Sequence, residues 1–555
     1  MIYNKKNKTS NKKGKISRFN NDKNVDGVFH RILNVINRKS IGKDRVRTTL
    51  MICVVTYTLV LSGYSVWKHS TFNTYAWDLG IFSQGMWTTV NDAEVFFNTC
   101  EQCYVESGSF FGVHFSPILY ALIPLYCVLQ RPETLLVIQS AVLGIAAIPL
   151  YLIGDDLLNA EAGLLFSASY LLNPATHGIN CYDFHVQSLL PLLLFTSIHF
   201  YNKKRWGPCT AATLLIPFVE EHTTYLLASI AVFMLLEAVA AGEVDRDKIS
   251  VSIAIVALAV VWDQMSSSIV KFFNPGASSL LLAGRHFRGL DIGDPRDIPY
   301  RALMSPLRAL ESMAFSLPEK TLYLAMLFAP VLFLPLRSLR ALIPTLPWFT
   351  ISLLSNYPPY YGIGYQYPAY VIPFIYYSAI IATRKKNDKG AQGHGKAAFA
   401  FLAANLIISL LFSPLGLGAS IGLGGPAYSR PGGSAHVQSL NRVLDRIPED
   451  ASVLTQDNLF PHVSSRRSAH VLCPPFEGPD AEWQAAIEAA LDSKPDYILL
   501  DPSTDYHGAS RELLWLMGGA PIETSYYLDG IYLFEMNYET PGGEHRDEQI
   551  SFKWR

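Results

Sequence analysis

A lone carboxylate, Asp78, stands in the aromatic stretch YAWDLGIFSQGMW at residues 75–87. It follows the hydrophobic segment 48–67 by eleven residues, so it would lie at a membrane surface if that segment crosses a bilayer. A carboxylate there can act as a general base or bind a substrate. It can also cap the helix LGIFSQGMWTTV, because Asp accepts hydrogen bonds from free helix N–H groups. We predict that Asp78 is catalytic and keep helix capping as the alternative.

Two further clusters of ionisable residues lie at the ends of apolar segments. The stretch NCYDFHVQS contains Asp183 and His185, and FVEEHTTY contains Glu220 and Glu221. Ionisable groups at membrane depth are costly and mark functional sites by default. We predict that these four residues and His114 of GVHFSP bind substrate, and that Asp183, His185 and Glu221 could hold a divalent metal ion. A helix cap and a solvated turn are the structural alternatives.

Two long loops carry side chains suited to a phosphate and to a sugar. Loop 267–319 contains AGRHFRGLDIGDPRD, in which Arg285 and Arg288 are predicted to bind a lipid phosphate, since guanidinium groups bind phosphate with two hydrogen bonds. Surface ion pairs with acidic residues of the same stretch are the alternative. Loop 355–370, SNYPPYYGIGYQYPAY, is rich in tyrosines that could stack on sugars or line a lipid groove.

The seven cysteines include one close pair, Cys100 and Cys103, in a CxxC pattern. A zinc site would need two more ligands at suitable spacing, and none is near in the sequence. The pattern therefore predicts either a local disulfide or two free thiols.

The composition indicates a membrane protein with many spans. Half of the 555 residues are hydrophobic and only 16% are charged, against about 25% in soluble proteins. The net charge of −1 says nothing about partners. Residues 1–47 are polar and rich in lysine, so we expect a disordered cytoplasmic tail followed by a start-transfer anchor at 48–67. The apolar segments are 48–67, 134–153, 160–173, 186–201, 208–220, 222–241, 249–266, 320–336, 339–354, 368–383 and 397–413.

The positive charges predict the topology. Lys and Arg collect in cytoplasmic loops, and the short basic loops are 203–205, 246–248, 337–340 and 384–396. All four lie on the side of the basic tail only if a twelfth apolar stretch, 114–130, does not cross the membrane fully. We therefore predict about eleven spans, with 114–130 re-entrant or lying on the surface, the N-terminus cytoplasmic and the C-terminus outside.

The C-terminal part reads as a soluble domain. After a glycine- and proline-rich linker at 414–433, residues 434–540 contain four predicted strands and an amphipathic helix at 481–493, followed by a polar tail at 541–555. Alternating strands and helices predict a small α/β domain with a largely parallel sheet. The strands are expected at 452–456, 469–473, 496–501 and 531–537.

Several motifs, in order along the chain, resemble a known family of prokaryotic membrane proteins. The stretches are WDLGIFSQGMW, HFSPIL, YDFHVQSLLPLLL, FVEEHTTYLL and YPAYVIPF. They resemble the family called domain of unknown function 2079, from about residue 50 to about 540. That family is grouped with membrane glycosyltransferases of the C-type fold, which take a sugar from a polyprenyl-phosphate carrier at the outer face. Those enzymes often carry a pair of acidic residues after the first span, whereas Asp78 stands alone between Trp77 and Leu79.

The resemblance implies a polytopic glycosyltransferase of the plasma membrane. It would transfer a sugar from a polyprenyl-phosphate donor to a glycan, lipid or protein acceptor of the cell envelope, with Asp78 as the base. Two other classes of function stay open. A transporter or flippase of lipid-linked sugars would use the same outer carboxylates, although no internal repeat is evident in the sequence. A non-catalytic envelope protein would use the membrane part only to present the α/β domain.

Overall fold

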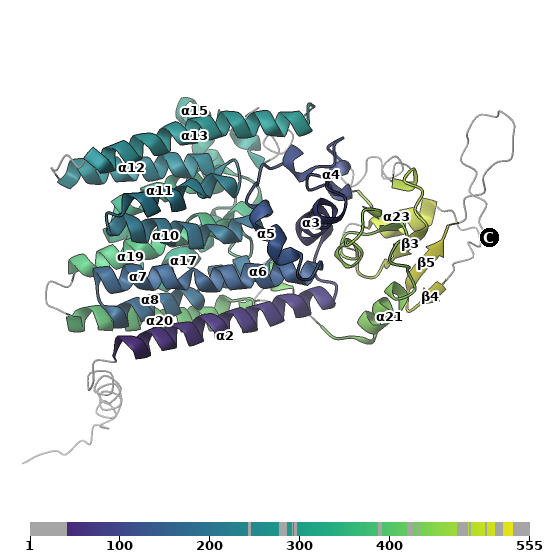
Figure 1. The fold of residues 1–555 in the computed structure, drawn as a ribbon, viewed down its shortest axis with the longest axis horizontal. Coiled ribbons are helices and arrows are strands. Elements are labelled where there is room, and N and C mark those ends of the chain that lie inside the picture. Colours follow the sequence, from purple (N-terminus) through teal and green to yellow (C-terminus); the bar gives the residue numbers. More distant parts are fainter. Residues whose placement is uncertain are drawn as a thin grey trace, which may run out of the picture. The chain divides into compact units, whose positions relative to one another are not determined.

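A computed structural model shows a mostly helical chain with a small sheet near its C-terminus (Figure 1). The chain divides into two units, Met1–Arg47 and Thr48–Arg555, and the second contains every described element apart from the first residues of one helix. The structure describes residues 42–241, 246–276, 286–290, 292, 297–386, 391–418, 426–429, 432–473, 487, 490–505, 508–516 and 526–536.

Four apolar stretches among the described residues are long enough to cross a membrane. They are the helices α2 (Lys43–Ser70), α12 (Thr223–Ala241) and α13 (Arg246–Phe273), and the consecutive pair α6 (Pro132–Ile145) and α7 (Ala147–Leu157). Their apolar side chains are partly exposed, as expected of helices that face lipid: Leu59 of α2 is 68% exposed.

The other predicted apolar segments form helices of 9 to 22 residues. They are α8 (Ala160–Leu171), α10 (Leu190–Asn202), α11 (Trp206–Leu214), α17 (Leu317–Phe328), α18 (Leu346–Leu354), α19 (Ile372–Lys386) and α20 (Ala391–Phe412). Several meet a proline or a 3₁₀ turn before reaching the ~20 residues of a full span, so the expected number of spans stays a prediction. Helices α7 and α8 pack with their backbones in contact, since a Cβ on Gly154 would lie 2.5 Å from the Cα of Gly163.

Residues 114–130 contain only the helix α5 (Leu119–Tyr126), of 8 residues. At 1.5 Å per residue it is about 12 Å long, too short for a hydrocarbon core of about 30 Å. The other short elements are the π-helix η1 (Ala76–Gly80); the α-helices α3 (Ile81–Asn91), α4 (Thr99–Gln102), α9 (Pro174–Cys181), α15 (Ile298–Met304) and α16 (Pro306–Ala314); and the 3₁₀ helices η2 (Phe110–Gly112), η3 (Val186–Leu189), η4 (Ile216–Phe218), η5 (Arg288–Leu290), η7 (Ala329–Val331), η8 (Leu334–Arg337), η9 (Leu339–Thr345), η10 (Pro358–Tyr361), η11 (Tyr367–Tyr370), η13 (Pro426–Tyr428) and η14 (Phe460–His462).

The C-terminal sheet has five strands in the order β2-β1-β3-β5-β4. The strands are β1 (Val453–Thr455), β2 (Ala469–Val471), β3 (Tyr497–Leu500), β4 (Tyr526–Leu528) and β5 (Ile531–Glu535). The first three pair in parallel, whereas β5 is antiparallel to both β3 and β4. The sheet is therefore mixed rather than largely parallel. The four expected strands are present. The fifth, β4, was not predicted; it has three residues and forms a hairpin with β5 through the tight turn at Asp529 and Gly530, which have φ of 55° and 83°.

Two helices, α21 (Ala435–Leu444) and α23 (Ala509–Leu516), accompany the sheet in Figure 1. Most of the helix expected at 481–493 lies outside the described residues, but Ile487 joins Leu454, Ile498 and Leu513 in a buried apolar core. His436, at the start of α21, binds two carboxylates of this domain: its Nε2 lies 2.8 Å from Asp501 and its Nδ1 2.9 Å from Asp529.

Both alternatives predicted for the CxxC pair, a local disulfide and two free thiols, are wrong. Cys103, which follows α4, forms a disulfide with Cys473, which follows β2, and Cys100 is a buried free thiol. The partners are 370 residues apart in sequence and meet because α4 packs against β2. This bond ties the segment after the first long helix to the C-terminal sheet.

Candidate functional site

Asp78 lies inside the π-helix η1, at the junction with α3, and not at a helix cap. The residue at the cap position is Tyr75, and no side chain caps either helix. The Asp78 carboxylate instead accepts a hydrogen bond from the Tyr182 hydroxyl (2.6 Å) and lies 3.2 Å from Nε2 of His185. A π-helical turn is rare and is frequent at functional sites. The arrangement therefore fits a carboxylate held for chemistry better than the predicted alternative of capping.

Asp183 contacts the start of the segment that carries Asp78. It does not belong to the group of possible metal ligands found among the described residues. Its carboxylate lies 3.1 Å from the Lys68 ammonium, and both side chains are 1% exposed. The second carboxylate oxygen accepts the backbone N–H of Tyr75 at 2.8 Å, which fixes the start of the π-helix. Burial raises the pKa of Asp183 to about 6, although Lys68 acts to lower it. Lys68 gave no signal in the sequence, because it reads as part of a basic helix end.

His185 links Asp183 to Asp78 through its two ring nitrogens. Nδ1 lies 3.0 Å from the backbone carbonyl oxygen of Asp183, and Nε2 faces the Asp78 carboxylate. The imidazole also stacks on the ring of Tyr182, with centroids 4.7 Å apart and planes at 13°. Tyr182 was not singled out from the sequence, although it stands in the same YDFH stretch. Asp183 and His185 thus lie together next to Asp78. The His185 imidazole faces the Asp78 carboxylate, and Asp183 binds the start of the turn that carries it.

A second cluster contains His114, Glu220, Glu221 and His222, each of which offers one ligand atom within 4.8 Å of the others. Nδ1 of His114 lies 3.0 Å from Oε1 of Glu221 and 3.4 Å from Oε1 of Glu220, and Nε2 of His222 lies 3.3 Å from Oε1 of Glu221. Two imidazoles and two carboxylates are a donor set that suits Zn²⁺ or Mn²⁺. Of the three residues predicted as possible metal ligands, Glu221 belongs to this cluster and Asp183 and His185 do not, and His222 is a ligand candidate that the sequence prediction left out.

Electrostatic attraction within this cluster is strong. Burial would raise the pKa of the Glu221 carboxyl, but the imidazoles of His222 and His114 outweigh it and lower that pKa to about 2. Burial would likewise lower the pKa of His114, and the carboxylates of Glu221 and Glu220 reverse this and raise it to about 10. The proton held by the His114 imidazole therefore lies where a cation would bind, and a metal ion would displace it.

An aromatic wall borders both clusters. Trp348 of α18 stacks on Tyr367 and Tyr370 at 5.0 and 5.1 Å, and the Tyr370 hydroxyl donates to Glu220. Burial raises the pKa of Tyr367, and the negative charges of Glu220 and Asp78 add to the rise. Tyr367 thus lies close enough to both clusters for a carboxylate of each to raise its pKa. The tyrosine-rich loop therefore lies next to the acidic groups, and its predicted contact with a sugar or a lipid stays a prediction.

The two arginines predicted to bind phosphate are not placed by the structure. Arg285 lies outside the described residues, and Arg288 begins η5, with its side chain not described. Their neighbour His286 stacks on Tyr357 at 3.9 Å and 11°, which brings this segment to the tyrosine-rich loop.

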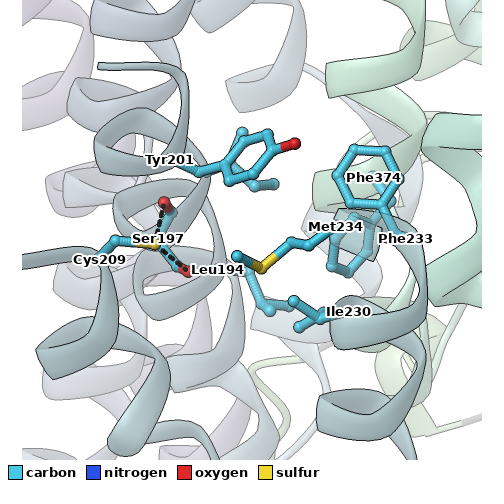
Figure 2. Close-up of a pocket in the computed structure, with 9 residues that line it drawn as sticks. Leu194, Ser197, Tyr201, Cys209, Ile230, Phe233, Met234 and Phe374 are labelled. Atoms are coloured by element: carbon cyan, nitrogen blue, oxygen red, sulfur yellow. Dashed lines mark hydrogen bonds between the residues drawn. The ribbon is translucent and has the colours of Figure 1, made fainter. Parts of the chain in front are cut away.

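A small pocket elsewhere in the helical part is apolar (Figure 2). It is lined by Leu194, Ile230, Met234 and Phe374, and the Cys209 thiol in its wall donates to the backbone carbonyl of Ser197 at 3.6 Å. None of the predicted site residues lines it, so it does not bear on the chemistry.

A family model described as "Predicted membrane protein (DUF2079)" matches residues 68–514. The chain belongs to this family. No curated protein matches the sequence. The resemblance found in the sequence is thus confirmed for the DUF2079 family, and its description agrees with the apolar helices of the structure.

Several solved structures are similar to this chain at low identity. The chain is similar to "ArnT from Cupriavidus metallidurans bound to Undecaprenyl phosphate", with 11% identity, a TM-score of 0.47, and 88% of this chain and 98% of that chain covered. It is also similar to the Archaeoglobus fulgidus oligosaccharyltransferase AglB in complex with an inhibitory peptide and a dolichol-phosphate, with 13% identity, a TM-score of 0.43, and 81% and 69% covered. A form of the same enzyme in complex with zinc and sulfate matches with a TM-score of 0.41, 13% identity, and 80% and 68% covered.

Proposed function

We propose that this DUF2079 protein is a membrane glycosyltransferase that moves a sugar from a polyprenyl-phosphate donor to an acceptor of the cell envelope. The observation that carries the proposal is the Asp78 carboxylate, held by Tyr182 and His185 in a π-helical turn. The partly exposed ring of Tyr365 lies 5.3 Å from that of Tyr182, the partner of Asp78, and aromatic rings suit the apolar faces of a sugar. The donor class follows from the sequence resemblance to the C-type transferases.

In this reaction Asp78 acts as the general base. It takes the proton of the acceptor hydroxyl while the acceptor oxygen bonds to the anomeric carbon. The bond from that carbon to the lipid phosphate breaks, and the phosphate leaves with the electron pair. Tyr182 and His185 orient the carboxylate, and Lys68 with Asp183 hold the turn on which it stands.

The leaving phosphate needs positive charge. His114, Glu220, Glu221 and His222 would hold a divalent ion, whose charge would offset that of the phosphate. Half of the His222 side chain is exposed, so this cluster is open to a ligand. Arg285 and Arg288 stay part of the proposal as further phosphate contacts.

The topology belongs to the same proposal. The tail 1–47 and the basic loops would be cytoplasmic, and the linker 414–433 and the domain 434–540 would lie outside together with Asp78. Cysteines introduced at residue 390 and at Glu449, an exposed position of the C-terminal domain, test this in intact cells. A reagent that does not cross membranes should label the cysteine at 449 and not the one at 390, and the opposite pattern would refute the orientation.

Mass spectrometry of envelope glycans and glycolipids tests the activity. Cells that lack the protein should lose one sugar modification, which returns with the natural chain and not with Asp78→Asn made in equal amount. Identical envelope glycans with and without the protein would overturn the proposed function.

A further inference from the structure

The sheet of the C-terminal domain has an edge at which ligands usually bind. Strand β1 lies between β2 and β3, and all three are parallel, so the chain leaves β1 and β3 towards opposite sides. In open α/β sheets, ligands bind beyond the carboxyl ends of the strands at such a switch point. Here that edge is formed by residues 456–458 after β1 and 501–504 after β3.

The chain fills this edge with its own polar groups. Gln456 donates to the backbone carbonyl of Asp501 and accepts its N–H, at 2.9 and 2.7 Å. Asn458 donates to the Thr504 hydroxyl at 3.1 Å. The side chains of Gln456, Asn458 and Asp501 are buried, and their hydrogen bonds join the two strand ends to each other. The place of a ligand is thus taken by a cross-link within the sheet.

Asp457, which lies between Gln456 and Asn458 in the sequence, contacts the segment that carries Asp78. The Ala76 N–H, the first of the π-helix, donates to the carboxylate of Asp457 at 2.7 Å and to its backbone carbonyl at 3.1 Å. At the other end of the same turn, Phe460 packs on Gly80 so closely that a Cβ there would lie 2.6 Å from its ring. The five residues Ala76–Gly80 are therefore bracketed at both ends by the loop after β1.

Contacts further along hold the two parts together. The buried amide of Gln84, in α3, donates to the backbone carbonyls of Arg466, Arg467 and Ala469 at 3.0–3.1 Å. The disulfide between Cys103 and Cys473 closes the same interface. A turn that is rare and costly on its own is thus fixed by groups from a distant part of the chain.

We propose that the C-terminal α/β domain is a positioning element for Asp78, and that Asp457 is the positioning residue that holds the π-helical turn. The inference rests on the proposed function for the role of Asp78, whereas the contact itself does not. The domain then acts through the membrane part, and its switch point needs no ligand of its own.

Hydrogen exchange of residues 75–81 in the full-length protein tests the contact. Asp457→Ala should raise their exchange about tenfold, since one hydrogen bond to a charged group is lost. Asp457→Asn keeps an acceptor oxygen and should restore slow exchange. Asp445→Ala, an exposed acid of the same domain, is the matched control and should change nothing.

Product formation in the same variants shows whether the contact between Asp457 and the π-helical turn matters for the reaction at Asp78. Raised exchange with product lost in Asp457→Ala and restored in Asp457→Asn supports both. Unchanged exchange in Asp457→Ala overturns the positioning role. Raised exchange with undiminished product supports the contact but overturns Asp457 as a positioning residue, and the role of Asp78 as the base is then decided separately by Asp78→Asn. If Asp457→Ala does not fold, Phe460→Leu makes the same test at the other end of the turn.

Discussion

The two oxygens of the Asp78 carboxylate have different surroundings, which gives a sharp test of its role. Oδ1 accepts the Tyr182 hydroxyl at 2.6 Å and faces His185 at 3.2 Å. Within the described part of the chain, Oδ2 makes no hydrogen bond, and the side chain is 17% exposed. Oδ2 is therefore the oxygen that we expect to take the acceptor proton.

Asp78→Asn separates holding from proton transfer. The amide oxygen can still accept from Tyr182, so the turn should keep its shape and the melting temperature should barely change. An amide cannot act as a base, and a positioned base contributes about 10²–10⁴ in rate. The rate of sugar transfer in membranes should fall by that factor, or about 2.7–5.5 kcal/mol of barrier.

Tyr182→Phe gives an intermediate loss. It removes one hydrogen bond to a charged group, which contributes about 1.5–3 kcal/mol, so the rate should fall by roughly 10–150-fold if the whole bond acts in the transition state. The rate of product appearance per amount of folded protein measures both variants. An Asp78→Asn protein with full activity, beside an unstable Asp78→Ala, would show that the carboxylate is structural and would refute the reasoning.

Three further outcomes are expected. Glu221→Gln should weaken Zn²⁺ or Mn²⁺ binding in calorimetry by more than the roughly 10–100-fold of an outer-shell partner, whereas Glu237→Gln, at a distant exposed ion pair, should not. Peptide mapping without reductant should find Cys103 joined to Cys473, and a Cys100–Cys103 link would contradict the structure. Burial acts to lower the pKa of His436, but its two aspartate partners raise it, so its stabilising contribution is complete below the unfolded pKa of about 6.5 and is lost as pH rises through the folded value. Thermal unfolding of His436→Gln should lack this loss, and an unchanged pH dependence would argue against the contact.

The sequence by itself determined the class of the protein and the parts of its site. Apolar runs and sparse charge specify membrane helices wherever they occur, because that signal is local. The candidate site residues Asp78, His185, Glu220 and Glu221 were also evident, since ionisable groups stand out between apolar segments. Four of the five strands were found for the same reason: each carries its own apolar pattern.

The tertiary structure decided which of these residues lie together. Asp183 and His185 were predicted as possible metal ligands because they are two residues apart. In the structure the Asp183 carboxylate pairs with the buried Lys68, and the His185 imidazole faces Asp78. His114 meets Glu221 across 107 positions, and Cys103 meets Cys473 across 370. Such pairings depend on how the helices and the sheet pack against one another. A local sequence pattern does not show which distant segments come into contact. The same holds for the π-helical turn at Asp78, which is fixed by Asp457 from the far end of the chain.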